Sequence, residues 1–103
     1  MSIVGHWDVS IKTPVGSLHV VYHFDRDDVS GLTGVAAGKH ETVPCTDIAV
    51  VDEGNGQRVR WRQSVTKPMR LTLAFDVLVE GDQLSGHSRA GRLPRSTVIG
   101  ARC

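Results

Sequence analysis

Cysteines, aromatic residues and long apolar runs are all scarce in this chain of 103 residues. Its two cysteines, Cys45 and Cys103, are too few for the disulfide framework of a small secreted domain, so we expect two free thiols. No stretch approaches the roughly 20 apolar residues that a membrane-spanning helix needs. The N-terminus lacks the basic and apolar regions of a secretion signal. The sequence therefore predicts a cytoplasmic protein without a membrane partner.

Signatures of cofactor and nucleic-acid binding are also missing. No G-x-G-x-x-G or P-loop arrangement precedes a helical pattern, so no cofactor is indicated. Arg58, Arg60 and Arg62 alternate on one strand, with Arg70 near its neighbour, and such a strip can follow a phosphate backbone. Proteins that bind single strands also stack bases on exposed aromatics, whereas all five aromatics here are predicted to face inward. With a net charge of only +1, we expect no nucleic-acid partner.

Charge is unevenly divided between the two halves of the chain. Residues 1–52 contain three basic and seven acidic side chains, and residues 53–103 contain nine basic and four acidic ones. Such asymmetry can orient self-association or attract an anionic ligand to one side of the molecule.

The two tryptophans each begin a similar run of residues. After Trp7 and Trp61 the matching segments are Thr13-Pro14 and Thr66-Lys67-Pro68, Phe24-Asp25 and Phe75-Asp76, and Leu32-Thr33-Gly34 and Leu84-Ser85-Gly86. This echo predicts that residues 1–52 and 53–103 repeat one module of strands within a single domain.

Apolar residues alternate with polar ones in most segments, which is the pattern of half-buried strands. A turn at Thr13–Gly16 pairs Ile11 with Leu18 and Trp7 with Tyr22, so that the apolar faces of two strands coincide. A turn at Gly81-Asp82 likewise pairs Val79 with Leu84 and Val77 with Gly86.

Two further hairpins follow from turn residues. With Asn55-Gly56 as the turn, Trp61 pairs with Val50 and Gln63 with Ile48. With a turn at Thr66-Lys67-Pro68, Val65 pairs with Met69, Trp61 with Leu73 and Val59 with Phe75. A third strand spans about Val29 to Ala37 with either face inward, and an eighth spans Ser96 to Arg102. We predict an all-β fold, an eight-stranded antiparallel up-and-down barrel with little or no helix; a flattened two-sheet sandwich is the alternative.

These registers define the interior. The predicted inward residues are Trp7, Val9, Ile11, Val20, Tyr22, Phe24, Ile48, Val50, Val59, Trp61, Gln63, Met69, Leu71, Leu73, Phe75, Val77, Leu84, Gly86, Ser88, Ala90, Ser96, Gly100 and Arg102. A barrel of eight strands either fills with side chains or holds one small ligand. The small residues of the last two strands face aromatics, which favours a pocket with an apolar lining and a few polar groups.

Gly5-His6-Trp7 on the first strand, together with Arg102 on the last, resembles the calycin pattern shared by lipocalins, fatty-acid-binding proteins and avidins. In that superfamily the tryptophan of Gly-x-Trp stacks under an arginine of the closing strand. The resemblance implies a lipocalin-like barrel closed at one end by Trp7 and Arg102. The ligand would then meet Tyr22, Trp61, Gln63 and Phe75, with Ser88 among the polar groups of the lining.

Two clusters of reactive side chains have simpler explanations. His6, Asp8, His19 and His23 fall on one outward face, with His6 opposite His23, but no short ligand motif supports a metal there, so we expect none. His40, Glu41 and Cys45 fall in one predicted loop as a base, an orienter and a nucleophile, a triplet that also arises by chance.

The sequence favours a protein that binds a small hydrophobic molecule inside the barrel. One alternative is an enzyme of isomerase, cyclase or hydrolase type, with Tyr22 as acid, Gln63 or Arg102 as oxyanion donor, and Asp76 or His87 as base. Another is a homodimeric interaction module that uses the basic outer face and the exposed Val21, Ala74 and Leu78.

Overall fold

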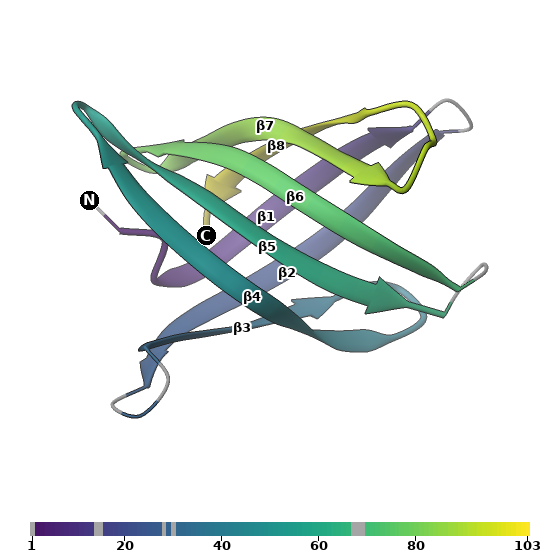
Figure 1. Ribbon diagram of the computed structural model, residues 1–103, viewed down its shortest axis with the longest axis horizontal. Helices are drawn as coiled ribbons and strands as arrows, with labels where there is room; N and C mark the ends of the chain where they lie inside the picture. The colour runs from purple at the N-terminus through teal and green to yellow at the C-terminus, as the bar shows by residue number, and fades with distance from the viewer. Residues whose placement is uncertain (1, 14–15, 28, 30, 67–69) are drawn as a thin grey trace.

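The structure is a computed structural model that describes residues 2–13, 16–27, 29, 31–66 and 70–103 (Figure 1). Its strands are β1 (Gly5–Thr13), β2 (Gly16–Asp27), β3 (Gly31–Ala37), β4 (Thr42–Glu53), β5 (Gly56–Val65), β6 (Leu71–Glu80), β7 (Gln83–Ala90) and β8 (Ser96–Arg102). Each strand pairs with its sequence neighbours, and β8 pairs with β1, which closes the barrel. No helix occurs among the described residues. The predicted up-and-down barrel is confirmed.

Three of the predicted registers and boundaries are also confirmed. Trp7 pairs with Tyr22 and Ile11 with Leu18, Val79 pairs with Leu84, and β8 has the predicted bounds. In the third strand, whose inward face the sequence left open, the buried residues are Gly34 and Ala36.

The register between β4 and β5 was predicted wrongly. Val50 pairs with Val59, not with Trp61, because the turn lies between Glu53 and Gly56. Gly54 has a φ of 63° and supplies the turn's left-handed conformation. Gly56 instead belongs to β5, where a Cβ atom would lie 2.4 Å from the carbonyl oxygen of Val79. Close packing of Gly56 against β6 therefore decides that Gly54, and not Gly56, supplies the glycine of the turn.

The register between β5 and β6 is shifted by the same amount. Trp61 pairs with Phe75 rather than Leu73, Val59 with Val77 rather than Phe75, and Val65 with Leu71; Met69 lies outside the described residues. Both errors are of two residues. Side chains alternate with a period of two, so each stays on its predicted face.

A bulge in β4 was not predicted. The register of β4 against β5 shifts between Thr46 and Ala49, and Asp47 has a φ of 52°. The extra residue changes which residues face inward, so that Cys45 is buried before the bulge and Ile48 is partly buried after it. Cys45 therefore lies in a strand rather than in a loop, and Gln63 does not pair with Ile48.

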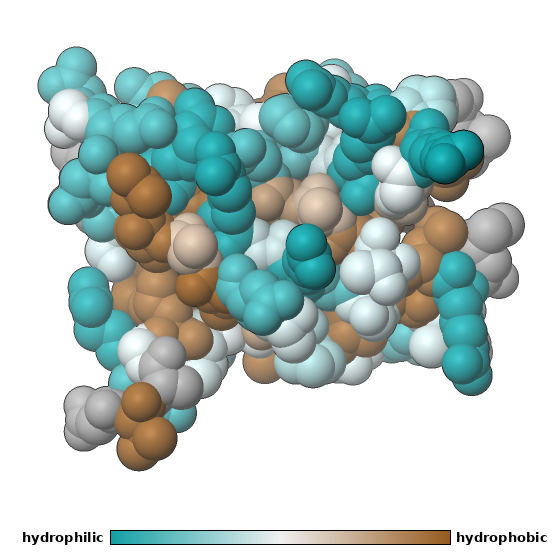
Figure 2. All heavy atoms as spheres, in the orientation of Figure 1, coloured by the Kyte–Doolittle hydropathy of each residue, from teal (hydrophilic) through white to brown (hydrophobic). Residues whose placement is uncertain are grey.

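The pairing of β3 with β4 is short. Only Gly34–Ala37 and Thr42–Cys45 form it, after which the two strands diverge (Figure 1). We call the place where β3 and β4 no longer pair the gap beside β3. Next to it, Val50 is 36% exposed although it lies on the inward face, and Leu32 and Ile48 are only partly buried. Apolar side chains are accordingly visible around β4 on this face of the molecule (Figure 2).

The two ends of the barrel differ in their packing. The termini and the β2–β3, β4–β5 and β6–β7 connections lie at one end, which we call the closed end (Figure 1). Apart from the gap beside β3, its inward side chains are fully buried, among them Ile3, Trp7, Val79 and Leu84. The other end, the open end, carries the β1–β2, β3–β4, β5–β6 and β7–β8 connections. Five inward residues there are only partly buried, namely Val20, Val43, Val65, Leu71 and Leu73, whereas Ile11, Ala36 and Val98 stay buried.

Candidate functional site

A small polar cluster lies inside the barrel, among residues predicted to touch a ligand. The Oε1 atom of Gln63 accepts a hydrogen bond from the Tyr22 hydroxyl at 2.8 Å and another from Nε1 of Trp61 at 3.1 Å. All three side chains are buried. They come from β2 and β5, which the register predictions placed on one inward face. Burial also raises the pKa of Tyr22 far above that of a free tyrosine, so its hydroxyl stays protonated at neutral pH.

Four aromatic rings fill the middle of the barrel beside this cluster. Trp61 stacks on Phe75 with 4.9 Å between ring centres, and Tyr22 and Phe24 meet Trp61 edge-on at 5.4 Å and 5.2 Å. Gly34 makes room for this layer, because a Cβ atom there would lie 2.7 Å from the Phe24 ring. At this level the interior is occupied by side chains. We call the four rings, together with Gln63 and Ser88 beside them, the floor. A ligand approaching from the open end would contact only the side of the floor that faces that end.

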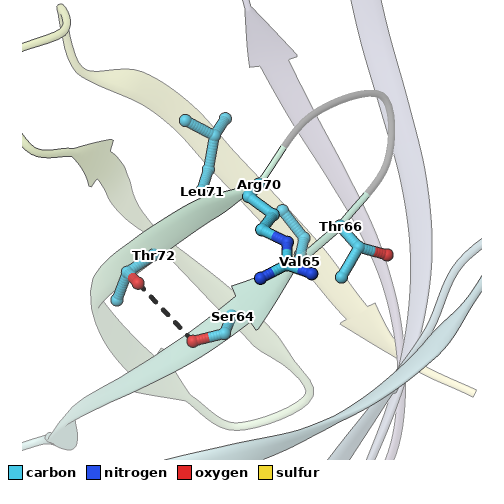
Figure 3. Close-up of a pocket in the computed structure, with 6 residues that line it drawn as sticks. All are labelled: Ser64, Val65, Thr66, Arg70, Leu71 and Thr72. Carbon is cyan, nitrogen blue, oxygen red and sulfur yellow. Dashed lines mark hydrogen bonds between the residues drawn. The ribbon is translucent and has the colours of Figure 1, made fainter.

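The open end provides an apolar approach to that floor. The partly buried Val65 and Leu71 pair across β5 and β6 at the rim. A depression of about 300 Å³ adjoins them, lined by Ser64, Val65, Thr66, Arg70, Leu71 and Thr72 (Figure 3). Ser64 and Thr72 belong to the outer face, so the depression wraps over the rim of the barrel. Of these residues, the sequence placed Leu71 on the inner face and Arg70 near a basic strip, but it did not bring them together as a site.

Glu41 connects two turns at the open end. Its carboxylate accepts hydrogen bonds from the backbone N–H of Thr66 at 2.8 Å and from the Thr66 hydroxyl at 2.7 Å. The N–H of Gly38 in turn donates to the carbonyl of Glu41 at 2.9 Å. The β3–β4 turn is thereby held against the end of β5. Nothing in the sequence indicated this link, since its two residues are 25 positions apart.

The triplet of His40, Glu41 and Cys45 does not assemble. Cys45 faces inward from β4, His40 is exposed on the preceding turn, and Glu41 is bound to Thr66. Burial raises the pKa of the Cys45 thiol to about 12, so that almost none of it is thiolate at neutral pH. Since the thiolate is the nucleophilic form, Cys45 is a structural residue.

The two cysteines should therefore differ in reactivity. In native protein at pH 8, we expect a disulfide reagent such as dithionitrobenzoate to modify one thiol rapidly, the exposed Cys103, and Cys45 more than a hundredfold more slowly. Cys103→Ser should leave almost no fast reaction, and denaturant should restore one reactive thiol in that variant. Rapid modification of native Cys103→Ser would show that Cys45 is not sealed inside the barrel.

Arg102 closes the other end over Trp7. Its guanidinium carbon lies 4.3 Å from the centre of the Trp7 ring. Nη1 donates to the carbonyl of Val4 at 2.7 Å, Nη2 donates to that of Ser2 at 2.7 Å, and Nε lies 3.0 Å from Oδ1 of Asp82. A Cβ atom at position 5 would lie only 2.8 Å from Nη1. The glycine of Gly5-His6-Trp7 thus leaves room for the arginine.

The outer wall holds the residues considered as catalytic bases. Asp76 and His87 pair with each other on the outside of β6 and β7. Partial burial disfavours the charge of Asp76, but its hydrogen bonds and charge pairing with Arg58 and Arg60 outweigh this and hold its pKa below the usual range. Neither residue can exchange a proton with Tyr22 across the wall. The same ion pairs partly neutralise the predicted basic strip.

The remaining outer candidates are dispersed. The His6 and His23 rings stack face to face with centres 4.1 Å apart, and the His19 ring contacts the carboxyl group of Asp8. In the part of the chain that the structure describes, no three metal-ligating side chains converge. Val21 lies on β2, whereas Ala74 and Leu78 lie on β6, four strands away, so they form no single patch. A second depression, of about 410 Å³, overlies the bulge and is lined by Asp47, Ala49, Arg60, Trp61, Arg62 and Ala74.

Charge separates between the two ends of the barrel. Near the open end lie the basic residues Lys12, Lys39, Arg70, Arg89, Arg92 and Arg95, with the acidic Glu41 among them. Near the closed end the acidic residues Asp25, Asp27, Asp52, Glu53, Glu80 and Asp82 outnumber the basic Arg26, Arg58 and Arg102. The sequence showed an imbalance between halves of the chain, but the fold converts part of it into a gradient along the barrel axis. An anionic group is therefore favoured at the open rim.

The described residues contain no helix that could cross a membrane. Comparisons with known protein families, with curated proteins and with solved structures find no significant match to this chain.

Proposed function

We propose that the protein binds a small hydrophobic molecule in the open half of its barrel. One observation carries the proposal: inward apolar side chains on four strands stay partly exposed at the open end, above a floor that contains buried polar groups. These side chains belong to Val20, Val43, Val65, Leu71 and Leu73. An apolar lining with a few fixed polar groups is the usual composition of a small-molecule site.

The floor determines how deep the ligand reaches. Phe75 covers one face of Trp61, and Tyr22 and Phe24 cover its edges. The ligand is therefore expected to contact Tyr22, Gln63, Phe75 and Ser88 from the open side, with less contact to Trp61 than the sequence suggested. The basic rim favours neutral or anionic ligands over cationic ones.

A relationship to the calycins is part of this proposal. It is supported by the closed eight-stranded barrel and by the contact of Arg102 with Trp7 beneath Gly5. We also propose that the protein is cytoplasmic and that it binds its ligand without a cofactor. Binding is favoured over catalysis because no carboxylate or histidine of the described strands faces the interior.

The proposal predicts that a bulky side chain at position 90 blocks binding. Ala90 faces inward opposite Leu73 near the open end, whereas Ala74 is the adjacent outward residue, opposite Arg89. We expect Ala90→Phe to weaken binding of the neutral fluorescent ligand N-phenyl-1-naphthylamine at least tenfold, because the phenyl ring occupies the approach to the floor. Ala74→Phe is the matched control and should bind as the wild type does. Fluorescence titration measures both, and thermal unfolding checks that both variants fold.

Two results would contradict the proposal. One is the absence of saturable binding of any of several neutral aromatic ligands by the wild type. The other is an affinity of Ala90→Phe equal to that of the wild type, which would place the ligand elsewhere. A loss of binding in Ala74→Phe alone would place it in the depression over the bulge of β4, which Ala74 lines.

A further inference from the structure

The amide of Gln63 uses only its oxygen in the polar cluster. The indole N–H of Trp61 can only donate a hydrogen bond, so the atom that faces it at 3.1 Å must be the amide oxygen. The Tyr22 hydroxyl donates to the same oxygen at 2.8 Å. The orientation of the amide is thereby fixed, and both acceptor sites of its oxygen are occupied. The NH2 group, with two N–H donors, points away from both partners.

This NH2 group has no hydrogen-bond partner among the described residues, although Gln63 is only 3% exposed. The hydroxyl of Ser88, also 3% exposed, has none in the same part of the chain. Among the described residues, every side-chain nitrogen or oxygen that solvent cannot reach at all has a hydrogen-bond partner. Both groups therefore border on a space that a water molecule can reach. A buried donor left without an acceptor costs about 1–3 kcal/mol, so an acceptor in that space is favoured.

The position of Gln63 connects this space to the open end. On β5 only one inward residue, Val65, lies between Gln63 and the rim. Across the sheet Gln63 pairs with the partly buried Leu73 on β6. Ser88 lies on β7 opposite Phe75, the ring that stacks on Trp61. The free donors therefore sit at the floor of the apolar approach, where the deepest part of a ligand would rest.

We propose that Gln63 selects ligands that carry a neutral hydrogen-bond acceptor, such as the carbonyl oxygen of a ketone, ester or amide, on their buried tip. This inference rests on the proposed function. A carboxylate is disfavoured at the floor, because no cationic side chain of the described strands faces it and burying an unpaired charge is costly. Arg102 is the one cationic side chain of those strands that faces inward, and it lies at the closed end. The apolar body of the ligand then points to the open end.

The test compares two ligands of the same shape, 2-acetylnaphthalene and 2-isopropenylnaphthalene, in which C=CH2 replaces C=O. Their dissociation constants are measured by displacement of N-phenyl-1-naphthylamine from the wild type and from Gln63→Met. We expect the preference for the ketone to be about tenfold greater in the wild type than in Gln63→Met, the value of about 1.4 kcal/mol for a hydrogen bond. The infrared C=O stretch of the bound ketone should lie at lower wavenumber in the wild type than in Gln63→Met, because the Gln63 amide donates a hydrogen bond to the carbonyl oxygen.

Additional variants guard against a failure to fold. Gln63→Met leaves the Tyr22 hydroxyl without an acceptor, so the double variant Tyr22→Phe/Gln63→Met is measured beside it. Gln63→Glu keeps an acceptor for Tyr22 and Trp61. Its neutral carboxyl group has one O–H donor and its ionised form has none, so the preference for the ketone should fall as rising pH ionises it. Ser88→Ala should reduce the preference less than Gln63→Met does.

The outcomes separate the two proposals. If neither naphthalene binds to the wild type, the proposed function is wrong. If both bind and the ketone preference is equal in the wild type and in every folded Gln63 variant, the barrel binds hydrophobic molecules but water satisfies the amide, and the inference about Gln63 is wrong. An equal C=O frequency of the ketone bound to the wild type and to Gln63→Met leads to the same conclusion.

Discussion

Replacing Arg102 by alanine is expected to lower the free energy of unfolding by about 3 kcal/mol, and so to lower the melting temperature by roughly 12 °C or more. The guanidinium donates to the carbonyls of Ser2 and Val4, and its Nη2 also lies 3.3 Å from the carbonyl of Gly81. It thus ties the N-terminal segment and the β6–β7 turn to the last strand. Its removal leaves the carbonyls of Ser2 and Val4 without this donor and uncovers the Trp7 ring.

Two companion variants identify the cause of this loss. Arg102→Lys keeps the charge beside Asp82 but not the planar fork, so it should recover less than half of the lost stability. Arg62→Ala is the matched control, because this exposed side chain makes no hydrogen bond or ion pair with the described residues, and it should change stability by less than about 0.5 kcal/mol. Chemical unfolding followed by circular dichroism measures all three. Full recovery by lysine would show that the ion pair with Asp82, not the fork, stabilises this end.

The same arginine illustrates how far sequence reasoning reaches. The alternation of residues places Trp7 and Arg102 on the inner face, and only the resemblance to the calycin pattern implied that they meet; the structure pairs them. The reason for Gly5 is not visible at that level. It depends on a 2.8 Å approach between an absent Cβ atom and Nη1 of Arg102, which requires the coordinates of both chain ends.

Register was predicted correctly at the β1–β2 and β6–β7 hairpins but not at the two hairpins that involve β5. Glu53-Gly54-Asn55-Gly56 offers two hairpin turns, and the choice between them depends on the contact of Gly56 with β6, which is not local. The bulge at Asp47 has no specific sequence signature, since aspartate tolerates a positive φ but is common in turns and loops as well. The burial of Cys45 therefore could not be foreseen.

The candidate site was predictable as a set of residues but not as an arrangement. Period-two alternation placed Tyr22, Trp61, Gln63, Phe75 and Ser88 on the inner face, where the structure has them. Which of them stack on one another, and which atom of the Gln63 amide is already bonded, depend on distances across the barrel. Those distances turn a set of lining residues into a floor with two free donors on Gln63.

The aromatic floor leads to the second large effect, in Trp61→Ala. We expect this change to lower the free energy of unfolding by about 3–5 kcal/mol, because it removes a fully buried indole from between Tyr22, Phe24 and Phe75 and leaves a cavity. Gln63 also loses one of the two donors to its oxygen. Trp61→Phe keeps a ring against Phe75 and should cost less than half as much. Urea unfolding followed by circular dichroism at 220 nm gives these values without relying on tryptophan fluorescence.

This expectation also determines which variants can report on binding. A loss of ligand affinity in Trp61→Ala would accompany a loss of fold, whereas Ala90→Phe changes the approach and Gln63→Met changes one donor group while the ring layer remains. The control for Trp61→Ala is Arg62→Ala, the next residue of the same strand, whose side chain points outward. If Trp61→Ala were within about 1 kcal/mol of the wild type, the indole would not be integral to the packed middle of the barrel. The ligand space would then extend past the floor toward the closed end, and Trp61 rather than Gln63 would mark its side wall.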